Sequence, residues 1–183
     1  MLAKKSIQAF AVFVVAAALT SCASLERPAA IEDAAVYQSG ALSFSMPGNW
    51  QVEHDLEQYG LRQIVIASVG GARIRLLELP GVYSLSLDEK LLLDRETLEE
   101  RVGPDAIGES RFETVNLKTP QGELQGIRHH YTLSKSRDLA PQVSDNYQLK
   151  YADATLYVTS EASLRTLPLV QAGFDQIIAT ITR

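Results

Sequence analysis

Three successive β-hairpin patterns constrain the fold more than any other feature of the chain. Each pattern joins two runs of apolar or alternating residues through a short turn signal: 62–69 with 72–79, 111–117 with 123–133, and 146–151 with 154–160. In the first pattern, Gly70-Gly71 supplies the positive φ angles that a tight turn requires. Because strands joined by such short turns pair antiparallel, the sequence predicts an antiparallel sheet.

Two helix patterns accompany the hairpins. Ser86 and Glu89 have the spacing of a capping box, and the amphipathic run behind them ends at Gly103-Pro104. The second pattern begins at about Leu167 and carries an apolar stripe at helical spacing: Leu167, Val170, Phe174, Ile177, Ile178 and Ile181. Such a stripe must be buried, and the sheet is the only surface available for it. We therefore predict an α+β fold, an antiparallel β-sheet of hairpins covered by helices.

The N-terminus has the organisation of a secretory signal. Lys4 and Lys5 precede an apolar run over 9–19, which is shorter than the ~20 residues of a membrane-spanning helix. The run leads into Leu19-Thr20-Ser21-Cys22, and Cys22 is the only cysteine of the chain. This segment closely resembles the lipobox of bacterial lipoproteins. The alternative is an ordinary signal peptide in which Cys22 is an incidental thiol.

The lipobox resemblance implies that residues 1–21 are removed and that the thiol of Cys22 is acylated. A cysteine that carries several acyl chains is stably anchored, so the lipid bilayer is the first expected partner. In lipoproteins the residue after the cysteine influences sorting, and Ala23 at this position favours the outer membrane. The expected location is therefore the periplasmic face of the outer membrane.

Composition and sequence pattern predict the domain organisation, the charge and the source of stability of the rest of the chain. Residues 22–40 show no sustained period and are predicted to be a flexible tether, so that one α+β domain spans 41–183. Loss of the two signal-peptide lysines leaves 15 basic and 22 acidic residues, a formal charge of −7. Such an acidic domain lacks the basic surface that nucleic-acid binding requires. Since the only thiol is expected to be acylated, the stability of the domain must come from its core rather than from a disulfide.

The start of the predicted domain is similar to a known family. Residues 42–50 read Leu-Ser-Phe-Ser-Met-Pro-Gly-Asn-Trp, and this strand-Pro-x-x-Trp entry resembles that of PsbP-like domains. The family includes the photosystem II extrinsic subunit, the bacterial DcrB-like proteins and mycobacterial LpqN-type lipoproteins. The order of the hairpins and the closing helix around 174–178 are also similar. The resemblance implies an accessory or binding protein, and it carries no active-site residue over to this chain.

Candidate catalytic and metal-binding residues are few. His129 and His130 are adjacent in a predicted strand, so they point to opposite faces and cannot chelate one metal. We interpret His129 as a partly buried, hydrogen-bonded residue of the sheet. Glu78, flanked by leucines, is interpreted as ion-paired or as lying at a strand end. The chain has no nucleophile-elbow motif and no calcium-loop spacing, so we predict no enzyme activity, no cofactor and no metal site.

Four tyrosines gather around the third hairpin pattern: Tyr131, Tyr147, Tyr151 and Tyr157. Tyrosines among polar neighbours suit a recognition surface, because each ring offers apolar area and a hydroxyl. They suit a half-exposed sheet equally well, and we favour that simpler interpretation.

These observations favour a non-enzymatic lipoprotein that has a binding or accessory role and a protein partner in the periplasm. An alternative is an immunity or inhibitor lipoprotein that neutralises a secreted toxin or an envelope hydrolase, with its acidic surface covering a basic cleft. A third hypothesis is a cell-envelope hydrolase, which requires a titratable pair in a deep pocket.

Overall fold

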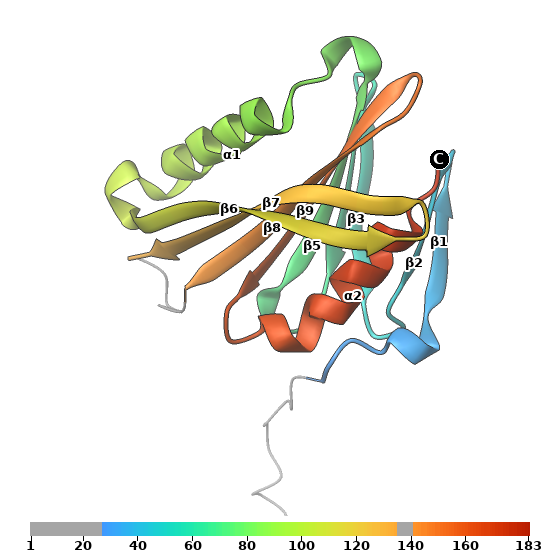
Figure 1. Ribbon diagram of the computed structural model, residues 1–183, viewed down its shortest axis with the longest axis horizontal. Helices are drawn as coiled ribbons and strands as arrows, with labels where there is room; N and C mark the ends of the chain where they lie inside the picture. The colour runs from blue at the N-terminus through green and yellow to red at the C-terminus, as the bar shows by residue number, and fades with distance from the viewer. Residues whose placement is uncertain (1–26, 135–140) are drawn as a thin grey trace, which may run out of the picture.

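The computed structural model describes residues 27–134 and 141–183, which form a seven-stranded sheet, a separate two-stranded hairpin and two α-helices (Figure 1). The strands of the large sheet lie in the order β3-β4-β5-β9-β8-β7-β6. Their bounds are Gln51–Gln58 (β3), Leu61–Ala67 (β4), Arg73–Pro80 (β5), Ile107–Thr119 (β6), Gly122–Leu133 (β7), Gln142–Lys150 (β8) and Ala154–Ser163 (β9). The remaining elements are the helices Leu87–Val102 (α1) and Leu167–Thr180 (α2), and the small hairpin of Ala35–Ser39 (β1) with Leu42–Met46 (β2).

The α+β class predicted from the sequence is confirmed. All three predicted hairpins pair antiparallel, as β4 with β5, β6 with β7, and β8 with β9. The third hairpin joins the other two, because β9 pairs with β5 and β8 pairs with β7. The capping box of Ser86 and Glu89 forms as well, with both of its reciprocal hydrogen bonds at the start of α1.

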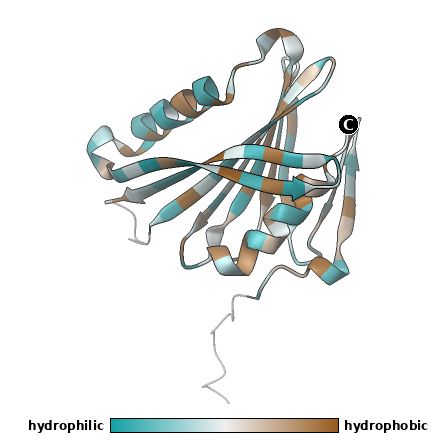
Figure 2. Ribbon diagram, in the orientation of Figure 1, coloured by the Kyte–Doolittle hydropathy of each residue, from teal (hydrophilic) through white to brown (hydrophobic). Residues whose placement is uncertain are grey.

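The apolar core lies between one face of the sheet and α2. The predicted stripe of α2 is buried at Val170, Phe174 and Ile177. It packs on side chains that point to the same face from the central strands: Ile64, Ile66, Ile74, Leu76, Leu156 and Val158. Figure 2 shows hydrophobic and hydrophilic positions alternating along α2, as expected for a helix with one buried side.

The turn that follows β2 packs closely against α2. Gly173 packs against the indole ring of Trp50, and a Cβ at position 173 would lie 2.5 Å from Trp50 Cζ2. Trp50 also meets Phe174 edge to face, with the ring centroids 5.3 Å apart. Because Gly173 has no side chain, the helix and the turn can approach this closely.

The N-terminal boundary predicted for the domain is wrong. Residues 35–39, which the sequence assigned to the tether, form β1 and pair with β2 along their whole length. Further upstream, the backbone N–H of Ala29 donates to the carbonyl of Leu169 in α2, and the Asn49 side chain donates to the carbonyl of Pro28. This segment has no periodic signal because β1 is a short strand without a buried side chain. The packed chain therefore begins near Pro28.

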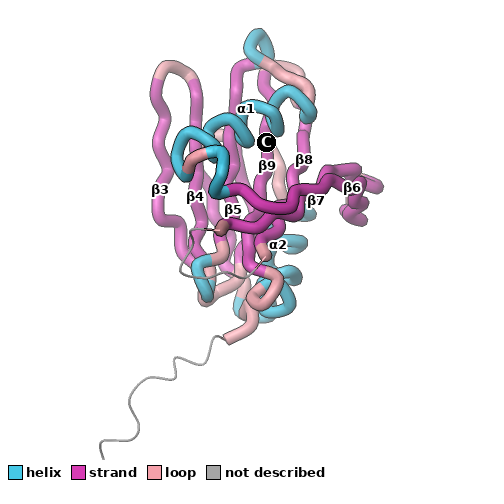
Figure 3. Tube along the Cα trace, turned by 90° about the vertical axis from the view of Figure 1, so that its left-hand side faces the viewer, coloured by secondary structure: helices cyan, strands magenta, loops and turns pink. Residues whose placement is uncertain are grey.

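The helix α1 covers the face of the sheet opposite to α2 (Figure 1). In the view turned by 90°, the β6–β7 hairpin swings away from the plane of β3, β4 and β5 (Figure 3). Sheets twist, and the accumulated twist turns the outer strands relative to the first ones. The sheet thus wraps around α2 on one side and leaves α1 lying across the other.

Candidate functional site

The face of the sheet under α1 is polar, in contrast to the face under α2. Six side chains form two rows across β5, β9, β8 and β7: Arg75, Thr159 and Asn146 in the first row, and Glu161, Ser144 and His129 in the second. A sheet face covered by a helix usually carries apolar side chains, because burying polar groups costs free energy unless they are hydrogen-bonded. We name these six residues the polar layer and treat them as the candidate functional site.

Asn146 is the centre of the hydrogen bonds in the polar layer. The Thr159 hydroxyl donates to Asn146 Oδ1 at 3.0 Å. The amide nitrogen of Asn146 donates to Ser144 Oγ, to the Ser144 carbonyl and to the Ile127 carbonyl, each at 3.3 Å. These three contacts are longer than the usual distance of about 2.9–3.0 Å. The buried amide group of Asn146 is therefore held in place by several hydrogen bonds, and those that its nitrogen donates are long.

His129 lies in an aromatic stack at the edge of the polar layer. Its ring stacks on Phe112, at 4.3 Å between centroids, and on Tyr131, at 4.8 Å. Its Nε2 lies 2.8 Å from Ser110 Oγ. Burial, with a smaller effect from the nearby Arg95, lowers the pKa of His129 to about 4. The interpretation of His129 as a hydrogen-bonded sheet residue is confirmed, and only 7% of the residue is exposed.

The pair of Ser110 and His129 is poorly suited to nucleophilic catalysis. In a serine–histidine–acid site, a carboxylate orients the imidazole and stabilises its protonated form. Within residues 27–134 and 141–183, no carboxylate is hydrogen-bonded to His129. An imidazole with a pKa of about 4 is also a weak general base near neutral pH. The arrangement favours neutral hydrogen bonding over proton transfer.

We expect His129 to make the folded state less stable as the pH falls from about 6.5 to 4. The unfolded histidine has a pKa of about 6.5. The pKa in the folded chain is about 4, so in this range protons bind mainly to the unfolded state and favour unfolding. Urea unfolding at pH 7, 5.5 and 4 measures the effect, and His129→Phe should flatten the dependence relative to the parent. Identical pH dependence in parent and variant would contradict the assignment.

Charged side chains surround a cavity of about 80 Å³ between α1 and the polar layer. Three ion pairs adjoin it: Arg75–Glu161, Lys90–Asp94 and Arg95–Glu99. Arg101, in the last turn of α1, also lines the cavity. It makes no salt bridge with a carboxylate in the part of the chain that the structure describes. Among the described residues that line the cavity, Arg101 is therefore a cation without a carboxylate partner.

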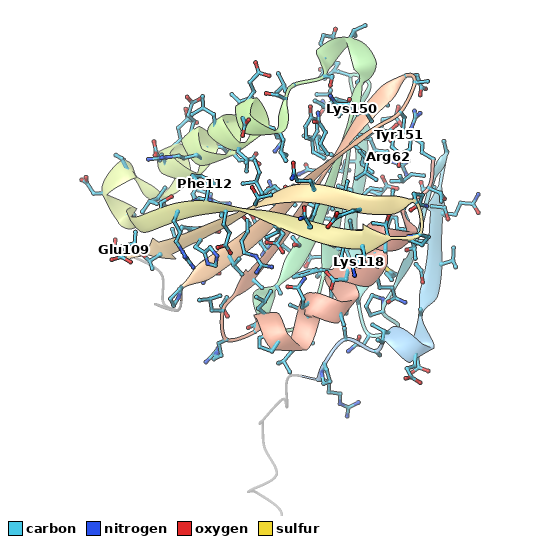
Figure 4. The ribbon with its side chains drawn as sticks, in the orientation of Figure 1. Arg62, Glu109, Phe112, Lys118, Lys150 and Tyr151 are labelled. Atoms are coloured by element: carbon cyan, nitrogen blue, oxygen red, sulfur yellow. The ribbon has the colours of Figure 1, made fainter. Side chains whose placement is uncertain are left out.

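A second depression, of about 320 Å³, lies beside the cavity and is mostly apolar. Leu91 and Leu92 of α1 form one wall, and Phe112 and Ile127 form the other. Figure 4 shows Phe112 between α1 and the β6–β7 hairpin. Leu92 and Phe112 are about half exposed. The apolar contact between α1 and the sheet is therefore not continuous.

The other predicted residues have structural partners of their own. His130 Nε2 lies 2.9 Å from Glu113 Oε1, so the two adjacent histidines do not share a partner. Among the described residues, no group of three or more metal-ligating side chains could hold an ion. Glu78 is ion-paired, as interpreted from the sequence, and its partner is Arg183 at 2.8 Å.

The interpretation of the tyrosines as a half-exposed sheet face agrees with the partial exposure of Tyr131 and Tyr151, but it is wrong for Tyr147 and Tyr157, which are buried. Tyr147 belongs to the apolar core on the α2 side. Tyr157 points to the other face, where its hydroxyl donates to the carbonyl of Leu85 just before α1. The register places Tyr147 opposite Val158 and not opposite Tyr157. Because a shift of one residue moves a side chain to the other face, the two rings are buried on opposite sides of the sheet.

Cys22 lies outside the described residues, so its lipidation remains a prediction. The same holds for the signal peptide over 1–21. Neither α1 nor α2, nor any other helix in the described ranges, is long and apolar enough to cross a bilayer.

Comparison with known proteins identifies the fold. No protein-family model matches the chain, and no curated protein matches it. The solution structure of cyanobacterial PsbP from Synechocystis sp. PCC 6803 matches 89% of this chain and 97% of its own, with 10% sequence identity and a TM-score of 0.51. The chain has a PsbP-like fold. A crystal structure from Bacteroides thetaiotaomicron covers 81% of this chain and 48% of its own, with 12% identity and a TM-score of 0.49.

Proposed function

We propose that the protein is a lipid-anchored envelope protein that works by binding and not by catalysis. Its anchor is Cys22, and its location is the periplasmic face of the outer membrane. The lipobox-like segment before Cys22 supports the anchor, and the PsbP-like fold is compatible with an accessory role. One observation carries the binding role: the hydrogen-bonded polar layer that the sheet places under α1.

The proposed anchor would hold the domain close to the membrane. Five residues lie between Cys22 and Pro28, so six residue steps connect Cys22 to the Pro28 carbonyl, which accepts a hydrogen bond from Asn49 of the folded part. At about 3.3–3.6 Å per residue, this linker spans at most about 20 Å. In Figure 1 the start of the described chain, coloured blue, lies at the bottom of the view and α1 lies at the upper left. The polar layer would thus face away from the bilayer to which Cys22 is attached.

The variant Cys22→Ser tests the anchor. We expect it to lose the acyl mass and to leave the membrane fraction, because a serine hydroxyl cannot form the thioether to the lipid. Intact mass spectrometry and fractionation of cell envelopes measure both effects. Arg27→Gln, a change outside the lipobox, should leave both unchanged. An acylated, membrane-bound Cys22→Ser protein would contradict the proposed function.

A second candidate function is the inhibition of a basic partner, such as a secreted toxin or an envelope hydrolase. The sequence of α1 contains six acidic and three basic residues, so this helix presents an acidic surface. Opposite charges would speed association with a basic cleft. Co-purification of the detergent-solubilised protein with one basic partner whose activity it blocks would favour this function over a general accessory role.

A further inference from the structure

We propose that the cavity between α1 and the polar layer binds a small organic anion, with one carboxylate and one or more hydroxyl groups. The inference rests on the binding role proposed above and names the ligand class of that site. It depends on three properties of the cavity: its size, its charge and the hydrogen-bonding groups at its floor.

The size of the cavity limits the ligand. Its volume is about 80 Å³. A site needs about 10–15 Å³ of such volume for each water molecule. The space therefore holds about five to eight water-sized groups, which corresponds to a ligand of about that many non-hydrogen atoms. The part of a ligand that this cavity encloses is therefore small.

The charges favour an anion. Arg75, Arg95 and Arg101 line the cavity, while Asp94 and Glu161 are its acidic residues. Both carboxylates are already engaged by cations, Asp94 by Lys90 and Glu161 by Arg75. The guanidinium of Arg101 is thus available for a carboxylate, which it matches in planar, two-pronged geometry. Because only this guanidinium is available among the described residues that line the cavity, we expect the ligand to carry one carboxylate.

The floor of the cavity favours hydroxyl groups. Ser144, Asn146 and Thr159 line it, and each is less than 10% exposed. Their side chains carry two hydroxyl groups and one amide group, which are hydrogen-bonded to one another across the floor. His129 lines the same space as a neutral imidazole. Neutral donors and acceptors of this kind recognise hydroxyl groups without adding charge.

Calorimetric titration of the purified, detergent-solubilised protein tests the proposal, with glycerate as the probe. Glycerate has one carboxylate, two hydroxyl groups and seven non-hydrogen atoms. We expect saturable binding of glycerate with one site per chain. We also expect at least tenfold weaker binding of glycerol, which lacks the charge, and of sulfate, which lacks the planar carboxylate. Equal binding of all three probes, or no binding of glycerate, would overturn the proposal.

Arg101→Gln should weaken glycerate binding about tenfold or more, because hydrogen bonds to a charged group contribute about 1.5–3 kcal/mol. The residue is exposed, so the variant is expected to fold. Arg111→Gln, on the exposed part of β6 and not lining the cavity, is the matched control and should bind glycerate as the parent does. Equal losses in the two variants would overturn the site. Because this titration does not depend on Cys22, its failure is distinguishable from failure of the anchor.

Discussion

Replacing Phe174 by alanine is expected to destabilise the folded protein by about 3–5 kcal/mol. The Phe174 residue is 1% exposed, lies in the centre of α2 and contacts the Trp50 ring. Truncation removes this apolar area and leaves a cavity that the rigid sheet cannot fill. Because single domains are stable by only about 5–15 kcal/mol, the loss would be a large share of the total.

Urea unfolding of the purified protein measures this loss as a shift of the midpoint at an unchanged slope. Leu93→Ala is the matched control, since Leu93 lies on α1 and is 47% exposed. Its effect should stay within about 0.5 kcal/mol. If both variants lost the same stability, α2 would not form the core in the way that the structure indicates.

A second large effect is expected at the buried ion pair between Arg128 and Asp145. Arg128 Nε and its terminal nitrogen donate to the two carboxylate oxygens of Asp145 at 2.6 and 2.7 Å. The Asp145 side chain is 5% exposed. Arg128→Met would leave this carboxylate buried without a counter-charge, which costs about 3–5 kcal/mol. The free energy of unfolding from urea titration at pH 7 measures the loss.

The double variant Arg128→Met with Asp145→Leu separates the unpaired charge from lost packing. With both charges replaced by apolar side chains, the stability should return close to that of the parent, because a buried ion pair contributes little net free energy. Asp175 lies nearby, and its pKa is raised by burial and by the charge of Asp145. If the double variant is as unstable as Arg128→Met alone, the packing of the arginine, and not its charge, stabilises this region.

The elements that could be predicted are those with strong local signals. The Gly70-Gly71 turn, the capping box at Ser86 and the apolar stripe of α2 each appear in the structure where the sequence places them. In each case a few neighbouring residues determine the backbone geometry. The strands β1 and β3 lack such signals, because both are largely exposed and neither has a regular alternation of buried residues.

The candidate site was harder to predict than the fold. The sequence draws attention to His129 but not to Ser144, Asn146 and Thr159, although these three alternate with the inward-facing residues of β8 and β9. The predicted third hairpin also started at 146, four residues after β8 begins. Serine, asparagine and threonine in a strand usually indicate a solvent-facing side. The position of α1 above them turns that side into a buried polar layer.

The sequence by itself determined the class of fold, the antiparallel hairpins and the helix that covers the core, because turn residues and apolar periodicity act over short distances along the chain. Only the tertiary structure decided which strand lies beside which, and so which polar side chains meet under α1. The pairing of β5 with β9 brings Arg75 next to Thr159, although the two residues are 84 positions apart in the sequence. Such a juxtaposition depends on the docking of whole hairpins, and no local pattern encodes it.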